Sequence, residues 1–233
     1  MTMRTTMATE VRSARPGEKK QAVWTLVRAF ADDPAARWMY PQTRRYLEFF
    51  PRFVESFAGP AFESGVVEQV GGYRGAALWL PPGVPPDENA IVALIESSVP
   101  ERERPAMLAV FEEMGRYHPP DPHWHLPMIG VEPRDQGAGY GSALLAAALA
   151  RCDATGTLAY LESSNPRNIP FYRRHGFEVL GTIQAGASPP VTPMLREPDP
   201  SKLAGRTRSA AGTTRKAGLD AALRREAGVL TNV

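Results

Sequence analysis

The feature that most constrains the fold is an apolar strand that runs into a glycine-rich loop and then a helix. Residues 122–131 (PHWHLPMIGV) predict the strand, residues 134–142 (RDQGAGYGS) the loop, and residues 142–156 an Ala/Leu-rich helix ended by Gly156. Such a loop leaves the N–H groups of the first helical turn unpaired, and the helix dipole adds partial positive charge there. The pattern therefore favours a phosphate-binding turn.

Three ligand classes compete for this loop. A nucleotide-phosphate loop of the Walker type needs Gly-Lys-Ser/Thr, but Gly141 is followed directly by Ser142. A dinucleotide loop fits Gly137 and Gly139 but has Ser142 in place of its third glycine. The third pattern, Q-x-x-G-x-G, is met by Gln136, Gly139 and Gly141, and it is the pyrophosphate loop of acetyl-CoA-dependent acyltransferases. On its own the loop fits a purely structural tight turn equally well.

A second motif decides between these readings. Residues 165–177 (NPRNIPFYRRHGF) follow a predicted strand and contain the pattern Asn165, Phe171, Tyr172, Gly176, Phe177. Together with the loop, this order and separation resemble the GNAT superfamily of N-acyltransferases. Within it, the segments AFADDP, ALWLPPG, YLESS and PMLREP are similar to the branch that includes puromycin N-acetyltransferase. The resemblance covers residues 8–197 and is strongest over 124–182, whereas residues 31–118 match loosely, so no substrate is carried over.

The resemblance implies an α/β fold with a mixed, mainly antiparallel central sheet flanked by helices, and a strand pair that splays apart to admit the cofactor. Residues 1–198 would form this one domain. The residue pattern predicts strands at 8–13, 66–82 (a hairpin with a tight turn at Gly71-Gly72), 122–131, 158–164, 177–184 and 191–198. It predicts helices at 15–33, 34–40, 43–59, 142–156 and 166–176, and two more within 87–117 that separate near Pro100.

Charge and composition narrow the class of protein. Segment 199–233 carries seven basic and three acidic residues, so the remaining chain has a net charge of −2 within a total of +2. A near-neutral body argues against a dedicated nucleic-acid binder. The tail is rich in small and polar residues, which predicts disorder with at most a short terminal helix. No apolar stretch is long enough for a membrane span, and the N-terminus lacks a secretory signal, so we expect a cytoplasmic protein. The sequence is compatible with a homodimer.

The resemblance also implies which residues hold acetyl-CoA. Strand residues would offer main-chain groups to the pantetheine arm, and an amide near Gly130 or Val131 would polarise the acetyl carbonyl. Backbone amides of the loop would hold the pyrophosphate, and two asparagines of the second motif would bond the pantetheine. The full set is Ile129, Gly130, Val131, Gln136, Gly137, Ala138, Gly139, Tyr140, Gly141, Ser142, Asn165 and Asn168.

Two residues are candidates for proton transfer. Tyr172 lies at the position of the family's general acid, and this role is favoured over the alternative of an aromatic core residue. Glu162, in the middle of a predicted strand, is a candidate base whose pKa we expect to be raised by apolar neighbours, with an ion pair or a backbone cap as the equally favoured alternative. His123 and His125 are further candidate bases or structural histidines. No acidic residue lies at metal-ligand spacing from them, so we predict no metal site.

The acceptor side is less defined. Asp32 and Asp33 could attract a cationic amine, although helix capping is the safer interpretation for Asp33. The aromatic residues Trp38, Tyr40, Phe49 and Phe50 could line a substrate pocket or fill the core. Cys152 is the only cysteine, and a packed small residue is a better interpretation than a nucleophile. The predicted reaction is direct acetyl transfer to a primary amine of a small molecule. The alternatives are a non-catalytic acyl-CoA sensor and a protein N-terminal or lysine acetyltransferase.

Overall fold

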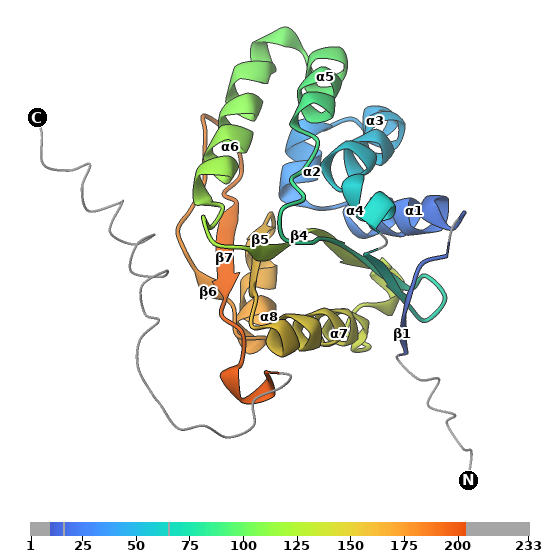
Figure 1. Ribbon diagram of the computed structural model, residues 1–233. Coiled ribbons are helices and arrows are strands. Elements are labelled where there is room, and N and C mark those ends of the chain that lie inside the picture. The colour runs from blue at the N-terminus through green and yellow to red at the C-terminus, as the bar shows by residue number, and fades with distance from the viewer. Residues whose placement is uncertain (1–9, 16, 65, 204–233) are drawn as a thin grey trace, which may run out of the picture.

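A seven-stranded sheet with helices on both faces forms the centre of the molecule (Figure 1). The computed structural model describes residues 10–15, 17–64 and 66–203. The strand order is β1-β2-β3-β4-β5-β7-β6, and only the β4–β5 pair is parallel. The strands are β1 (Val11–Ser13), β2 (Val67–Val70), β3 (Gly75–Leu80), β4 (His123–Val131), β5 (Leu158–Ser163), β6 (Glu178–Val179) and β7 (Thr192–Arg196). The predicted mixed, mainly antiparallel sheet is confirmed.

The helices divide between the two faces of the sheet (Figure 1). One face carries α1 (Lys19–Ala29), α2 (Pro34–Met39), α3 (Thr43–Phe57), α4 (Pro60–Ser64), α5 (Glu88–Ser98) and α6 (Arg104–Tyr117). The other carries α7 (Tyr140–Thr155) and α8 (Ile169–Arg174). Four 3-10 turns, η1 (Glu101–Glu103), η2 (Pro133–Asp135), η3 (Pro166–Asn168) and η4 (Pro200–Lys202), complete the described part. None of its helices is both long and apolar enough to cross a bilayer.

Strand β3 shows why the sheet needs both helical layers. All six of its residues are buried. Leu78 and Leu80 pack into the core beneath α1–α6, whereas Ala77 and Trp79 pack against α7. Successive side chains of a strand point to opposite faces, so a strand covered on both sides is apolar at every position.

The parallel β4–β5 ladder stops halfway along β4. Its register runs from His123–Leu158 to Leu126–Leu161, but β4 continues to Val131 while β5 pairs onward with β7. Pro127 follows the last paired residue, and the register of β3 against β4 shifts at the same place. Proline has no N–H to donate and tends to occupy bulges within sheets, so the two strands part here. Beyond Leu126, the β5-facing backbone of β4 has no strand partner among the residues that the structure describes.

Three predicted elements differ in detail. The β2–β3 connection is a four-residue turn, closed by a hydrogen bond from Arg74 N to the Val70 carbonyl, and not a tight two-residue turn. The strand predicted at 177–184 is reduced to β6 and a single bridge at Ile183, because Gly181 interrupts the run. Helix α7 begins at Tyr140, two residues earlier than predicted. Within the predicted tail, η4 is structured, and residues 204–233 lie outside the described residues.

A buried ion pair ties the end of α7 to the last strand. Asp153 accepts hydrogen bonds from Nη1 and Nη2 of Arg196 at 2.7 and 3.1 Å, and from the backbone N–H of Asp199 at 2.8 Å. Its side chain is 2% exposed. Burial alone would raise the pKa of Asp153, but the bonds from Arg196 and Asp199 bring it below the ordinary aspartate value. The carboxylate is therefore charged and fully bonded at neutral pH.

We predict that Asp153→Asn destabilises the protein by about 3 kcal/mol, because it leaves the Arg196 charge buried without its counter-charge. The pKa of Asp153 is lower in the folded state, so its contribution is complete above the unfolded value of about 3.9 and is lost as the pH falls through the folded value. Urea unfolding at pH 7 and at low pH measures both effects. Glu112→Gln is the control, since Glu112 is 67% exposed in its pair with Arg116 and should cost less than about 1 kcal/mol. Equal losses for the two variants would contradict the prediction.

Candidate functional site

A cleft of about 710 Å³ opens where β4 separates from β5. Its walls come from the end of β4, the glycine-rich loop with the start of α7, and the η3–α8 segment. Every residue predicted to bind the cofactor lines this cleft except Ala138: Ile129, Gly130, Val131, Gln136, Gly137, Gly139, Tyr140, Gly141, Ser142, Asn165 and Asn168. The fold therefore brings both sequence motifs to one opening in the sheet.

The loop presents an uncapped helix start to this cleft. Gly139 is the N-cap of α7, has φ of +87°, and makes no side-chain capping bond. Only glycine adopts this backbone conformation readily, and a Cβ at this position would point into open space. Gln136 ties the loop to the strand end through a 3.3 Å bond from Nε2 to the Val131 carbonyl. The unpaired N–H groups of the first turn, together with Arg167 and Arg174 across the cleft, suit a phosphorylated ligand.

The close approach of α1 to β4 depends on Gly130. A Cβ there would lie 2.5 Å from the Cβ of Ala29, so any side chain would push α1 off the strand. The absence of a side chain keeps the backbone of β4 and the end of α1 together at the floor of the cleft. Close backbone packing of this kind is a common reason for glycine within a strand.

Asn165 and Asn168 lie on the opposite wall. The Oδ1 atom of Asn165 accepts from the backbone N–H of Arg167 at 3.1 Å, which caps η3 and leaves the Nδ2 group available to a ligand. Asn168 lines the cleft and also the adjoining pocket described below. The two asparagines therefore have different surroundings, although both face the opening.

Tyr172 lies at the junction of the cleft and a second, narrower pocket, and it lines both. Its side chain is largely buried, and no group within the described residues bonds to its hydroxyl. Burial, followed by the charge of Asp33, raises the pKa of Tyr172 above the ordinary tyrosine value. The phenol therefore keeps its proton at neutral pH. It contacts the core through Phe177 and also faces the cleft, so the packing and functional interpretations of Tyr172 are compatible.

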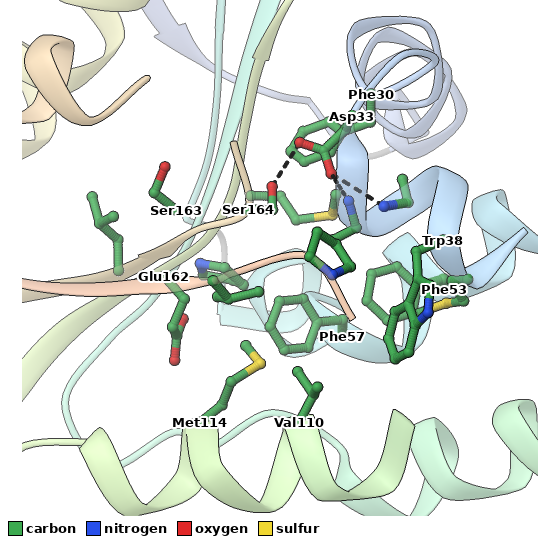
Figure 2. A pocket seen from close by; sticks show the side chains of 18 of the residues that line it. Phe30, Asp33, Trp38, Phe53, Phe57, Val110, Met114, Glu162, Ser163 and Ser164 are labelled. Atoms are coloured by element: carbon green, nitrogen blue, oxygen red, sulfur yellow. Dashed lines mark hydrogen bonds between the residues drawn. The ribbon is translucent and has the colours of Figure 1, made fainter. Parts of the chain in front are cut away.

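The second pocket, of about 110 Å³, is enclosed largely by aromatic side chains (Figure 2). They are Phe30, Trp38, Phe50, Phe53, Phe57 and Phe111. Of the four aromatic residues predicted for a pocket, Trp38 and Phe50 line it. Tyr40 and Phe49 do not, because Tyr40 is buried against Phe49 and bonds the hydroxyl of Ser98 at 2.8 Å. We call this space the aromatic pocket.

Asp33 occupies the end of the aromatic pocket nearest the cleft (Figure 2). Its Oδ1 accepts from the N–H groups of Ala35 and Ala36, which confirms the predicted cap of α2. Its Oδ2 accepts from the Ser164 hydroxyl at 2.7 Å. Burial raises the pKa of Asp33, partly offset by these bonds. Asp32 lines the cleft but not the aromatic pocket, so the two aspartates do not form one acidic patch there.

Glu162 lies at the other end of the aromatic pocket, beside Phe57 and Met114 (Figure 2). Its carboxylate contacts two histidines: Nε2 of His125 is 2.8 Å from Oε2, and Nε2 of His118 is 3.3 Å from Oε1. The expected rise in its pKa is wrong. Burial alone would raise it, but the two imidazoles lower the pKa of Glu162 to about 2. The structure instead contains the contact that the predicted alternative needs, a carboxylate between two imidazoles, which is an ion pair when an imidazole is protonated.

The sequence interpretation missed His118. It is the C-cap residue of α6, where helical periodicity stops and no motif marks it. Spacing along the chain also did not reveal an acidic partner for His125. That partner is Glu162, which lies 37 residues further along the chain on a neighbouring strand. With His123, these residues border a third cavity of about 660 Å³ that opens on the side of α5 and α6. Glu162 lines both this cavity and the aromatic pocket.

Cys152 takes no part in this arrangement. It lies on α7, is buried in the core, and does not line the cleft or either pocket. Burial raises the pKa of its thiol to about 11, which keeps it protonated and unreactive. The predicted structural role is the one that the packing supports.

Comparison with known proteins agrees with this geometry. The family profile of the acetyltransferase (GNAT) domain matches residues 87–179. A protein of Schizosaccharomyces pombe, described as an uncharacterized N-acetyltransferase, is 27% identical over 197 residues, which cover 77% of this chain and 80% of that protein. Residues 87–179 therefore match a GNAT acetyltransferase domain, and the protein is an acyltransferase.

Two solved structures share the fold. One, from Corynebacterium glutamicum, is described as histone acetyltransferase HPA2 and related acetyltransferase. It is 27% identical to this chain, and the match covers 83% of this chain and 98% of the Corynebacterium chain, with a TM-score of 0.58. The other is arylalkylamine N-acetyltransferase 2 from Aedes aegypti, which is 10% identical to this chain. The match covers 82% of this chain and 99% of that chain, and the TM-score is also 0.58. At that identity the second likeness concerns the fold alone.

Proposed function

We propose that the protein transfers the acetyl group of acetyl-CoA directly to a primary amine of a small molecule. The observation that carries the proposal is the continuity of the site. The cleft at the strand opening meets the aromatic pocket at Tyr172, so a cofactor in the one and an amine in the other would meet at a phenol. GNAT domains use acetyl-CoA, and the uncapped start of α7 fits its pyrophosphate.

The residues of the cleft have distinct parts in holding the cofactor. The backbone N–H groups from Gly137 to Ser142 would bind the pyrophosphate, which explains why the loop needs no lysine: the phosphates are held and do not react. The β5-facing backbone of β4 from Ile129 to Val131 would bond the pantetheine arm, and Asn165 and Asn168 would bond it from the other wall. Bound acetyl-CoA supplies an activated thioester. An amide near Gly130 or Val131 would stabilise the oxyanion that develops on its carbonyl.

Proton transfer would use the two ends of the aromatic pocket. Tyr172 is protonated and unbonded, so it can donate to the departing thiolate. A proton from the amine would pass to the Glu162–His125 pair. The carboxylate alone is a weak base, but its 2.8 Å bond to the imidazole lets the pair hold the proton jointly. No covalent intermediate on the enzyme is required, in keeping with the buried, protonated Cys152.

The aromatic pocket supports a small amine as the acceptor. Its aromatic rings offer an apolar wall to the carbon part of an amine, and the carboxyl groups of Asp33 and Glu162 at its two ends offer partners to the amino group. Aromatic rings also attract an arriving cation through their faces. The arylalkylamine enzyme of similar fold acts, by its name, on an amine of this general kind.

Three further predictions from the sequence stay predictions. They are the resemblance to the puromycin branch, the cytoplasmic location and a homodimer.

A second acceptor class is a protein lysine or N-terminus. The Corynebacterium structure described as a histone acetyltransferase motivates this class. A lysine side chain could also enter a narrow apolar pocket, but its peptide would need an open groove along the surface. Comparing small amines with lysine-containing peptides at equal concentration, by release of free CoA thiol, separates the two classes. A marked preference for the peptides would replace our proposal with this alternative.

We predict that Tyr172→Phe lowers acetyl transfer at least tenfold while CoA affinity changes little, because the ring stays and only the proton donor is removed. Thiol release with the best amine of a panel gives the rate, and calorimetry gives the affinity. Tyr73→Phe is the matched control: its hydroxyl bonds Glu18 at 3.0 Å, away from the cleft and the aromatic pocket. An unchanged rate in Tyr172→Phe would remove this residue as the acid.

We also predict that Gly139→Ala weakens CoA binding about tenfold, equivalent to about 1.4 kcal/mol. The methyl group would enter the open side of the loop, and the left-handed backbone would strain. Gly72→Ala imposes a similar backbone strain at φ of +68° in the β2–β3 turn, outside the cleft. Both variants should lose similar stability in thermal unfolding, and only Gly139→Ala should lose CoA affinity in calorimetry. Equal CoA affinity for both would contradict the assignment of the loop.

A further inference from the structure

Three separate elements bring potential metal ligands together at the border of the third cavity. His118 comes from the end of α6, His125 from β4 and Glu162 from β5. One nitrogen of each histidine and one carboxylate oxygen lie within 4.8 Å of one another. Zinc bonds to nitrogen and oxygen are about 2.0–2.2 Å long, which places tetrahedral ligand atoms roughly 3.3–3.6 Å apart. The 3.3 Å contact between Oε1 of Glu162 and His118 matches that spacing, whereas the 2.8 Å contact between Oε2 and His125 is shorter and would lengthen around an ion.

The hydrogen bonds around His118 point its free lone pair at Glu162. The Asp121 carbonyl can only accept, so the His123 Nδ1 atom, 2.8 Å away, must donate to it. In a neutral His123 the Nε2 atom is then an acceptor, and it takes the hydrogen of His118 Nδ1 at 3.3 Å. The Nε2 atom of a neutral His118 therefore carries a lone pair. It faces the Oε1 atom of Glu162, and two lone pairs repel unless a cation or proton lies between them.

Glu162 and His125 also carry buried polar atoms that have no hydrogen-bond partner within the described residues. The Oε1 atom of Glu162 is buried and makes no hydrogen bond within the described residues, although Nε2 of His118 lies 3.3 Å from it. The Nδ1 atom of His125 also has no partner there, so no outer bond fixes which nitrogen of His125 holds the hydrogen. Its Nε2 atom, 2.8 Å from the Glu162 carboxylate, donates a hydrogen there, and a shift of that hydrogen to Nδ1 would leave Nε2 with a lone pair for a cation.

We propose that His118, His125 and Glu162 form a binding site for a divalent cation of the zinc class. Two imidazoles and one carboxylate are a ligand set that zinc takes with a water as fourth ligand. The cavity of about 660 Å³ beside the three residues gives access for the ion and room for that water. His123 is a positioning residue, since its bond to Nδ1 orients His118.

The cation site has one consequence that rests on the proposed acetyl transfer. A bound cation takes the lone pairs of Glu162 and His125, and the pair could then no longer accept a proton from the amine. Zinc would therefore inhibit acetyl transfer, and a chelator would restore it. The Glu162 side chain faces both the cavity and the aromatic pocket, which is how one carboxylate connects the two sites.

The test is a titration of the full-length, chelator-treated protein with Co²⁺ and Zn²⁺. We expect one equivalent of Co²⁺ to produce the strong visible absorption of tetrahedral cobalt, which Zn²⁺ then displaces. His118→Ala and Glu162→Gln should each weaken the affinity at least tenfold. The His118 side chain is partly exposed at a helix end, so its removal should leave the fold intact, as thermal unfolding will verify. His175→Ala is the matched control: His175 is the C-cap residue of α8, outside the cluster, so this variant should bind the metal like the parent protein.

Absence of a saturable cobalt spectrum in the parent protein would overturn the proposal, and so would an unchanged affinity in a folded His118→Ala variant. The binding measurement needs no acetyl transfer, so its failure is separate from a failure of the proposed function. Tyr172→Phe makes the distinction explicit: it should bind cobalt like the parent protein whether or not it transfers acetyl groups.

Discussion

The separation of β4 from β5 is the constraint on which the rest of the site depends. The two strands are paired only up to Leu126 and Leu161, and Pro127 then removes a donor at the point where the β3–β4 register also shifts. Every later strand residue on that edge of β4 faces a gap in the sheet. The start of α7, the end of β4 and the η3–α8 segment line the gap, which makes one cleft from two distant sequence motifs. Without this break the glycine-rich loop would end above a closed sheet.

The two helical layers then determine what each side of the break can do. The α7–α8 layer supplies unpaired amides and positive charge, which suit a phosphorylated cofactor. The α1–α6 layer supplies aromatic rings and a small apolar pocket, which suits an acceptor that must lose its hydration. Tyr172 belongs to the first layer but reaches the second, so it occupies the place where a group transferred between them would be.

Local patterns predicted the parts of this site that local structure determines. The loop, the α7 helix with its Gly156 end, and the Asp33 cap depend on bonds within a few residues, and all were predictable. The environment of Glu162 was not, because it depends on His118, whose position follows from how α6 packs at the edge of the sheet. Such neighbours decide whether the pKa of a buried carboxylate is raised or lowered. Burial alone therefore predicted a raised pKa for Glu162, which is the wrong direction. For the same reason, spacing along the chain could not reveal a ligand set drawn from α6, β4 and β5.

The central claim is that acetyl-CoA binds in the break between β4 and β5. A crystal structure of the protein with CoA tests it most directly. We expect the pyrophosphate within hydrogen-bond distance of the backbone N–H groups between Gly137 and Ser142, and the pantetheine arm between the two strands with its thiol near Tyr172. A pantetheine arm lying outside the gap, with the pyrophosphate away from the start of α7, would contradict the account.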